Sequence, residues 1–182
     1  MNKIFLLLSV LMGVVVLISN YLVQFPIKYF SLSEILTYGA FTYPIAFLIT
    51  DLANRFYGKL FAKKVVYIGF IVGICFTLFF STNFADFISI RIAIGSGIAF
   101  ITAQLLDVQI FDRLRKKNWY VAPLSSSLIG STVDTFLFFS ISFYGTGVPW
   151  ITLSLGDLAV KIFIALLMLI PFRILLGTLK PV

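Results

Sequence analysis

The sequence contains no histidine and a single cysteine, and both shortages exclude familiar kinds of site. Without an imidazole, histidine-based zinc centres, histidine-based acid–base catalysis and Ser-His-Asp triads each lose a required part. Because Cys75 has no second thiol to pair with, no disulfide can form within the chain. No P-loop is present either, so we do not expect the chain itself to hydrolyse ATP.

Charged residues are also scarce, at 12% of 182 residues, whereas 60% are hydrophobic and the mean hydropathy is +1.08. Soluble domains carry about 25% charged residues, so the chain falls outside that class. Apolar runs of about 20 residues recur, which is typical of membrane-spanning helices. We therefore expect an all-α integral membrane protein in the lipid bilayer, with residues 1–182 forming a single domain.

Six transmembrane helices are predicted, which leaves no room for a soluble catalytic domain. They cover about Ile4–Val23, Ser33–Thr50, Val65–Ser81, Ile88–Leu106, Val121–Phe143 and Leu153–Gly177. Pro44 and Pro171 fall inside the second and sixth of these spans. A proline is tolerated there because neighbouring helices can satisfy the carbonyl group that it frees. The first apolar run lacks a clear cleavage site, so we expect a retained helix rather than a cleaved signal.

Positive charges gather in alternate connections between the predicted spans. One side carries Lys3, the group Arg55, Lys59, Lys63 and Lys64, the group Arg113, Arg115, Lys116 and Lys117, and then Arg173 and Lys180. The opposite side carries only Lys28 and Arg91. The positive-inside rule therefore predicts that both termini are cytoplasmic. Because the positive residues flank apolar runs, the net charge of +7 does not indicate a nucleic-acid partner.

Asp134 lies near the middle of the predicted fifth span. A central aspartate costs roughly 2.5–3.5 kcal/mol on insertion scales, so it should face a cavity, pair with a cation or be protonated. Ser127, Ser131 and Asp134 follow the i, i+4, i+7 spacing of one helical face. This pattern indicates a buried functional site. A structural carboxylate bonded to hydroxyl groups of another helix is the alternative.

Another ionisable pair begins the predicted sixth span. Asp157 and Lys161 are four residues apart, so they share a helical face and could form an ion pair. Arg91, near the outer end of the fourth span, either extends to the membrane surface or pairs with Asp157 or Asp134. The sequence does not choose between these arrangements.

Buried amides and carboxylates complete the polar inventory of the spans. They fall in three close pairs: Gln104 with Asp107, Asp51 with Asn54, and Asn20 with Gln24. Each amide in lipid needs a partner, either another helix or a polar ligand. We expect Asp51 to be a structural or gating group. Carboxylates, amides and aromatic rings together suit a planar neutral heterocycle with N–H and C=O edges. A strongly anionic substrate would require more arginines in the spans than Arg91 alone.

Several stretches in order along the chain resemble one known family. They are SNYLVQFP (Ser19–Pro26), the segment Phe41–Lys64, RIAIGSGIAFITAQLLDVQIFDRLR (Arg91–Arg115), WYVAPLSSSLIGSTVDTFLFFSISF (Trp119–Phe143) and DLAVK (Asp157–Lys161). Together they resemble the YhhQ-type queuosine precursor transporters of the VUT family. Leu158 stands where that family's last motif usually has an aromatic residue.

The resemblance implies a six-helix uptake protein of the bacterial inner membrane, with a fold similar to the S-components of vitamin (ECF-type) transporters. It also implies import of a 7-deazaguanine base, mainly 7-cyano-7-deazaguanine, for queuosine salvage. We predict that Asp134, assisted by Ser131 on its polar face, accepts from the guanine-like edge. Gln104 and Asn20 would be amide contacts, and Asp157, Lys161 and Arg91 a charged network at the outer mouth.

Other readings of the sequence remain open. The substrate could be another vitamin-like base or nucleoside, or the chain could be a non-transporting assembly subunit. An intramembrane aspartyl protease built on Asp107 and Asp134 would need surrounding motifs that are missing, so we do not expect an enzyme. We also expect no bound metal and no cofactor. The sequence does not reveal whether a second copy or a separate energising module acts with the chain.

Overall fold

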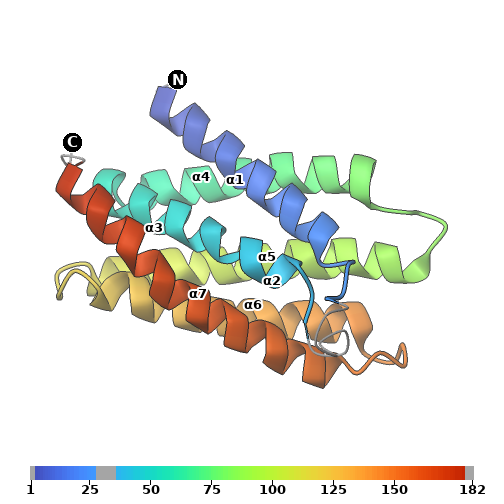
Figure 1. The fold of residues 1–182 in the computed structure, drawn as a ribbon. Helices are drawn as coiled ribbons and strands as arrows, with labels where there is room; N and C mark the ends of the chain where they lie inside the picture. Colours follow the sequence, from blue (N-terminus) through green and yellow to red (C-terminus); the bar gives the residue numbers. More distant parts are fainter. Residues whose placement is uncertain (1–2, 28–35, 179–182) are drawn as a thin grey trace.

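The computed structural model describes residues 3–27 and 36–178, and in these ranges the chain folds into helices (Figure 1). They are α1 (Lys3–Leu22), α2 (Gly39–Thr42), α3 (Pro44–Tyr57), α4 (Lys59–Phe76), α5 (Phe87–Leu114), α6 (Val121–Phe143) and α7 (Trp150–Thr178). A π-helical segment, η2 (Thr77–Ser81), continues α4. Among the described residues, five helices are long and apolar enough to cross a membrane: α1, α4 with η2, α5, α6 and α7.

The predicted second span differs most from the structure. It was expected over Ser33–Thr50 with Pro44 inside, but Pro44 instead begins α3, and the helix continues to Tyr57. Proline lacks a backbone N–H and is favoured in the first helical turn, so it starts a helix more readily than it continues one. Residues 33–35, Lys28 and Lys180 lie outside the described residues.

Two other helices extend beyond their predicted limits. The third span was expected from Val65, but α4 begins at Lys59, and the fourth was expected to end at Leu106, but α5 continues to Leu114. Hydropathy marks where the apolar layer ends, whereas lysine and arginine are good helix formers and let the helix continue into the polar region. The fifth predicted span, Val121–Phe143, coincides with α6.

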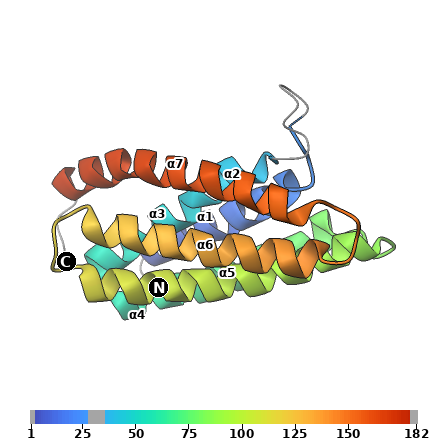
Figure 2. The same cartoon turned by 90° about the horizontal axis from the view of Figure 1, so that it is seen from below.

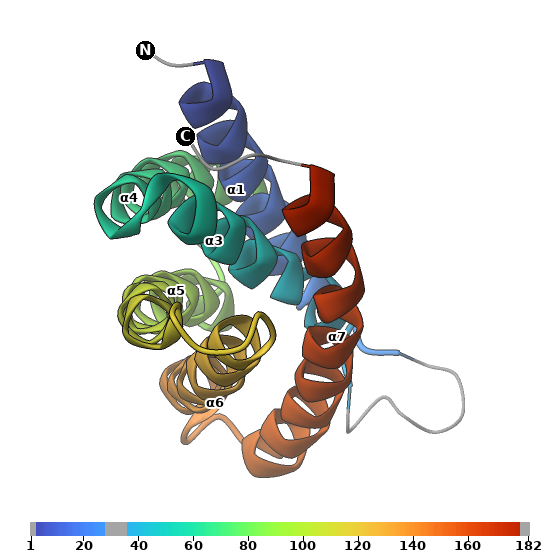
Figure 3. The ribbon, with the colours of Figure 1, turned by 90° about the vertical axis from the view of Figure 1, so that its left-hand side faces the viewer.

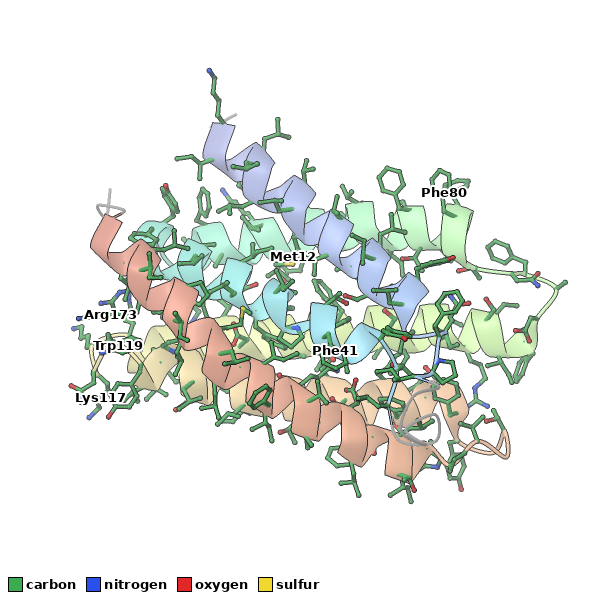
Figure 4. The ribbon with its side chains drawn as sticks, viewed as in Figure 1. Met12, Phe41, Phe80, Lys117, Trp119 and Arg173 are labelled. Atoms are coloured by element: carbon green, nitrogen blue, oxygen red, sulfur yellow. The ribbon has the colours of Figure 1, made fainter. Side chains whose placement is uncertain are left out.

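The helices run alternately up and down, so the connections divide between two ends of the bundle. The first residues of α1, the last of α7, the α3–α4 junction and the α5–α6 loop lie at one end, on the left of Figure 1. Lys117, Trp119 and Arg173 lie at this end and Phe80 lies towards the other (Figure 4). We call it the cation-rich end. The sequence predicted that most positive residues lie on the same side as the start of the first helix and the end of the last. The described residues have this arrangement.

Helix α3 occupies the centre of the bundle and contacts α1, α4, α5, α6 and α7. Seen from one end, α5 and α6 lie together on one side while α7 and α1 curve around α3 (Figure 3). Figure 2 shows α5 and α6 running side by side, with α7 above them in that view. The central helix carries buried Thr50, Asp51 and Asn54. The polar groups of the fold are therefore enclosed by apolar helices.

Candidate functional site

Lys161 joins α6 and α7 through a buried ion-pair network. Its Nζ lies 2.9 Å from Asp134 Oδ2 and 2.6 Å from Asp157 Oδ2. It also donates to Thr135 Oγ1 at 3.1 Å, and the Thr135 hydroxyl donates to Asp157 Oδ2 at 2.9 Å. The predicted pairing of Asp157 with Lys161 is therefore present. Asp134 is the third charged residue of the network.

This network has an excess of negative charge and a free acceptor. Two carboxylates, of Asp134 and Asp157, face one ammonium group, and all three side chains are at most 5% exposed. Asp134 Oδ1 makes no hydrogen bond of ordinary geometry among the described residues, and the Tyr43 hydroxyl lies beside this carboxyl group. A buried acceptor left without a donor costs about 1–3 kcal/mol, and more when charged. The site therefore offers one carboxylate oxygen to an incoming donor.

A small cavity of about 20 Å³ adjoins this oxygen. It is lined by Ser19, Asn20, Val23, Gly39, Tyr43, Asp134, Phe138, Asp157 and Lys161. A cavity of this size holds roughly one water molecule, whereas a cavity that binds benzene measures about 150 Å³. A heterocycle can therefore enter only if the surrounding helices separate. We call this space the Asp134 cavity.

Tyr43 supplies an aromatic wall of the Asp134 cavity. It occupies the junction between α2 and α3, and the Lys161 ammonium lies 4.9 Å from its ring centroid. Its ring also meets Phe100 edge to face, with centroids 6.2 Å apart, and its hydroxyl lies beside Asp134 and Ser96. Ammonium groups at this distance from an aromatic ring are attracted by its quadrupole. Tyr43 therefore helps to hold Lys161 beside the carboxylates.

Asn20 lies on the same cavity and connects three elements. Its Nδ2 donates to Thr77 Oγ1 at 3.1 Å, and the Ser96 hydroxyl donates a short hydrogen bond to its Oδ1. Thr77 begins the π-helical segment η2, and such segments occur frequently at functional sites. The Asn20 side chain is thus hydrogen-bonded to residues of η2 and α5, and it also lines the Asp134 cavity.

The other three predicted site residues lie elsewhere. Arg91 donates from Nε and Nη2 to the Ile141 carbonyl at 2.9 and 2.6 Å, so it joins α5 to α6 rather than pairing with Asp134 or Asp157. The predicted charged network thus contains Asp157 and Lys161 but not Arg91. Gln104 Oε1 accepts from Thr50 Oγ1 at 2.5 Å and lies outside the lining of the Asp134 cavity.

Ser131 and Asp134 were predicted on one polar face, and both are buried, but they line different cavities. Ser131 lines a second cavity with Asp51 and Ser127. Ser131 and Asp134 are three positions apart on α6, so the two cavities follow one another along this helix.

The sequence prediction missed Tyr43 and Thr135. Thr135 follows Asp134 directly, and a hydroxyl next to an intramembrane carboxylate is a signal that the sequence contains. Tyr43 precedes Pro44, so it was assigned to the inside of a continuous span. Its position at a helix junction became clear only when the break between α2 and α3 was known.

Comparison with known proteins identifies the family. The sequence profile described as "Putative vitamin uptake transporter" matches residues 37–176. The chain belongs to the vitamin uptake transporter family. The family resemblance expected from the sequence is therefore confirmed. Together with the five apolar helices, this membership makes the chain a multi-pass bacterial membrane protein.

Curated proteins similar to this member of the vitamin uptake transporter family have transporter names. A "Probable queuosine precursor transporter" of Haemophilus influenzae is 36% identical over 84% of this chain and 77% of its own length. A "Queuosine precursor transporter" of Escherichia coli is 32% identical over 90% and 82%. A "Probable queuosine precursor transporter" of Bacillus subtilis is 26% identical over 89% and 80%. No solved structure gives a significant match.

The region matched to the vitamin uptake transporter family contains most of the Asp134 cavity. Gly39, Tyr43, Asp134 and Phe138 fall within residues 37–176, as does the DLAVK stretch that holds Asp157 and Lys161. Helix α1 contributes its cavity residues from outside that region.

Proposed function

We propose that this chain imports a queuosine precursor across the bacterial inner membrane. The substrate class is a 7-deazaguanine base such as 7-cyano-7-deazaguanine. Relatives covering most of the chain carry the name of queuosine precursor transporters. The unpartnered Oδ1 of Asp134, facing a cavity with an aromatic wall, is the observation that carries the proposal.

The chemistry of this cavity suits a guanine-like edge. Such an edge presents a ring N–H and an exocyclic amine side by side, and a carboxylate can accept from both. In our proposal Asp134 Oδ1 accepts one of these donors, while Lys161 keeps Oδ2 oriented. Asn20 lies on the same wall and offers an amide contact to the rest of the ring, and Tyr43 and Phe138 offer aromatic surface to its faces.

Transport also requires the cavity to open and close. At about 20 Å³ it is too small for a bicyclic base, so α1 and α2 must separate from α6 and α7 to admit one. In the proposed topology α2 and α3 together form the sixth crossing, with the cation-rich end in the cytoplasm. The Asp134 cavity would then lie nearer the outer surface. This six-span arrangement would be similar to that of the S-components of vitamin transporters.

Uptake of labelled 7-cyano-7-deazaguanine by a salvage-dependent strain tests the proposal. Asp134→Asn removes the charged acceptor while preserving the shape of the side chain. A hydrogen bond to a charged group contributes about 1.5–3 kcal/mol, so the apparent affinity should fall about 10- to 150-fold. The matched control is Asp112→Asn, because Asp112 lies at the cation-rich end, partly exposed and paired with Lys59. Normal uptake by Asp134→Asn at normal protein level would contradict the assigned role.

Two alternatives give different outcomes in a related experiment. If the substrate is another vitamin-like base or nucleoside, that compound will compete with the labelled base more strongly than unlabelled 7-deazaguanines do. If the chain is a non-transporting assembly subunit, the purified protein will bind the base but will not move it into liposomes. Uptake by the purified protein alone supports the transporter.

A further inference from the structure

A second polar cluster lies beside the Asp134 cavity, nearer the cation-rich end. Asp51, on the central helix α3, accepts from the hydroxyls of Ser126 and Ser127 at 3.1 and 3.3 Å. Asp107, on α5, faces the same carboxyl group. Asp51 is 2% exposed and Asp107 is completely buried. Asp107 lies beside the Ser126 hydroxyl and the Asp51 carboxyl group. Among the described residues, neither of its oxygens makes a hydrogen bond of ordinary geometry.

Among the described residues, no cation forms an ion pair with either carboxylate. Several positive groups on the surrounding helices have other partners: Arg55 donates to the Arg115 carbonyl, Lys59 pairs with Asp112, Arg173 lies over the Trp119 ring and Lys161 pairs with Asp134 and Asp157. Arg91 donates to the Ile141 carbonyl, Lys64 and Arg113 are exposed, and Lys63 is partly exposed. Lys3 is exposed at the start of α1. The pair therefore has no positive charge to balance it. Two carboxylates sharing a low-dielectric site do not both ionise readily, and one shared proton satisfies both.

An independent observation indicates that this cluster binds something. A cavity of about 10 Å³ adjoins Asp51 and is also lined by Ser127 and Ser131. The hydroxyl of Ser131 is 1% exposed and has no hydrogen-bond partner among the described residues. The volume is at the lower limit for a single water molecule. A metal cation needs several oxygen ligands around it, whereas a proton needs no volume at all. The small cavity therefore favours a proton.

The cluster is also positioned to sense the substrate cavity. Ser127 and Asp134 are seven residues apart on α6, or about 10 Å at 1.5 Å per residue. Consecutive residues Tyr43 and Pro44 line the two cavities at the α2–α3 junction, and on α7 Ala165 lies one turn beyond Lys161. A helix movement that opens one cavity must therefore displace walls of the other.

We propose that Asp51 and Asp107 form a proton site that couples inward proton movement to import of the base. This proposal rests on the proposed function. One proton arrives from the outer side, is shared between the two carboxyl groups while the base occupies the Asp134 cavity, and leaves to the cytoplasm as the base is released. Neither carboxylate is required to contact the base.

Proteoliposomes containing the purified protein test the coupling. The quantity measured is the ratio of labelled 7-cyano-7-deazaguanine uptake with an inside-alkaline pH gradient to uptake without one, at zero membrane potential. With one proton per base, a gradient of about one pH unit supports up to about tenfold accumulation, since 1.36 kcal/mol corresponds to a factor of ten. We expect a ratio near one for Asp51→Asn and Asp107→Asn and the wild-type ratio for Asp112→Asn. Because a ratio is measured, a variant with a low absolute rate remains informative.

Several outcomes would overturn the coupling. One is an uptake ratio near one for the wild-type protein. Another is uptake that depends on a sodium gradient instead of a pH gradient. A third is the wild-type ratio in both Asp51→Asn and Asp107→Asn. If the wild-type protein does not exchange the base at all, the proposed function fails, and infrared difference spectra then test the proton site alone. We expect the carbonyl stretch of a buried protonated carboxyl group in the wild type and its loss in Asp107→Asn. The same band in Asp51→Asn/Asp107→Asn would overturn the proton site.

Discussion

At the scale of single residues, the Lys161 network shows which contacts helical spacing predicts and which depend on how the helices pack. Asp157 and Lys161 are one turn apart on one helix, so their pairing could be predicted from the sequence. Asp134 is 27 residues from Lys161 and reaches it only because α6 packs against α7. Breaking a buried ion pair costs about 3–5 kcal/mol when the remaining charge is left uncompensated. The contribution of Lys161 should therefore be visible in stability as well as in transport.

Lys161→Met tests that contribution. The substitution leaves the carboxylates of Asp134 and Asp157 facing each other without a cation, so we expect the free energy of unfolding to fall by about 3–5 kcal/mol. Thermal unfolding in lipid nanodiscs measures the change as a lower midpoint temperature. The matched control, Lys64→Met, removes a lysine from the exposed part of α4 and should leave the midpoint almost unchanged. Equal midpoints for the two variants would show that the network is not stabilising.

Tyr43 allows the aromatic wall to be tested separately from the charges. Base–aromatic stacking contributes about 1–3 kcal/mol, so Tyr43→Leu should weaken binding of 7-cyano-7-deazaguanine about 5- to 150-fold. Tyr43→Phe retains the ring and should remain within a few-fold of wild type. Equilibrium binding to the purified protein measures both affinities. A large loss in Tyr43→Phe would assign the effect to the hydroxyl group instead of the ring.

At the scale of elements, the bounds of α6 could be predicted from the sequence, whereas the places where helices meet could not. Gly69 and Gly73 of α4 pack closely against Met12 and Val16 of α1. The identity of that partner depends on the assembled bundle, so spacing alone could not predict it. The α2–α3 break was missed because hydropathy averages across Pro44. The residues that line the two cavities could not be predicted either, because each cavity is lined by side chains from three or more helices.

Gly73→Leu tests the close contact between α1 and α4. A Cβ atom at this position would lie 2.8 Å from Val16 Cβ, so a larger side chain must force the helices apart. Overpacking of this kind costs about 1–3 kcal/mol, and we expect a lower unfolding midpoint in nanodiscs. Gly177→Leu is the matched control, because a Cβ atom there has no neighbour within 4 Å. A wild-type midpoint for Gly73→Leu would mean that α1 moves away from α4 at no measurable cost.

At the scale of the whole molecule, charge and topology agree with each other. The two ends of the described chain, the α3–α4 junction and the α5–α6 loop share one end of the bundle (Figure 1). Positive residues concentrate there, whereas Arg91 lies near the opposite end and is held by the Ile141 carbonyl. In the proposed topology, based on the positive-inside rule, the cation-rich end is cytoplasmic. Under the proposed function, import would carry the base from the Asp134 cavity past Asp51 and Asp107, a direction that depends on this orientation.

Cysteine accessibility in intact cells tests the orientation. Cys75, the single native cysteine, is replaced by serine, and one new cysteine is introduced as Ala85→Cys or Lys116→Cys. Both positions are exposed, the first in the α4–α5 loop and the second in the α5–α6 loop at the cation-rich end. A membrane-impermeant maleimide should label Ala85→Cys in intact cells and Lys116→Cys only after permeabilisation. The reverse pattern would invert the topology, and would place the Asp134 cavity nearer the cytoplasm than the Asp51–Asp107 pair.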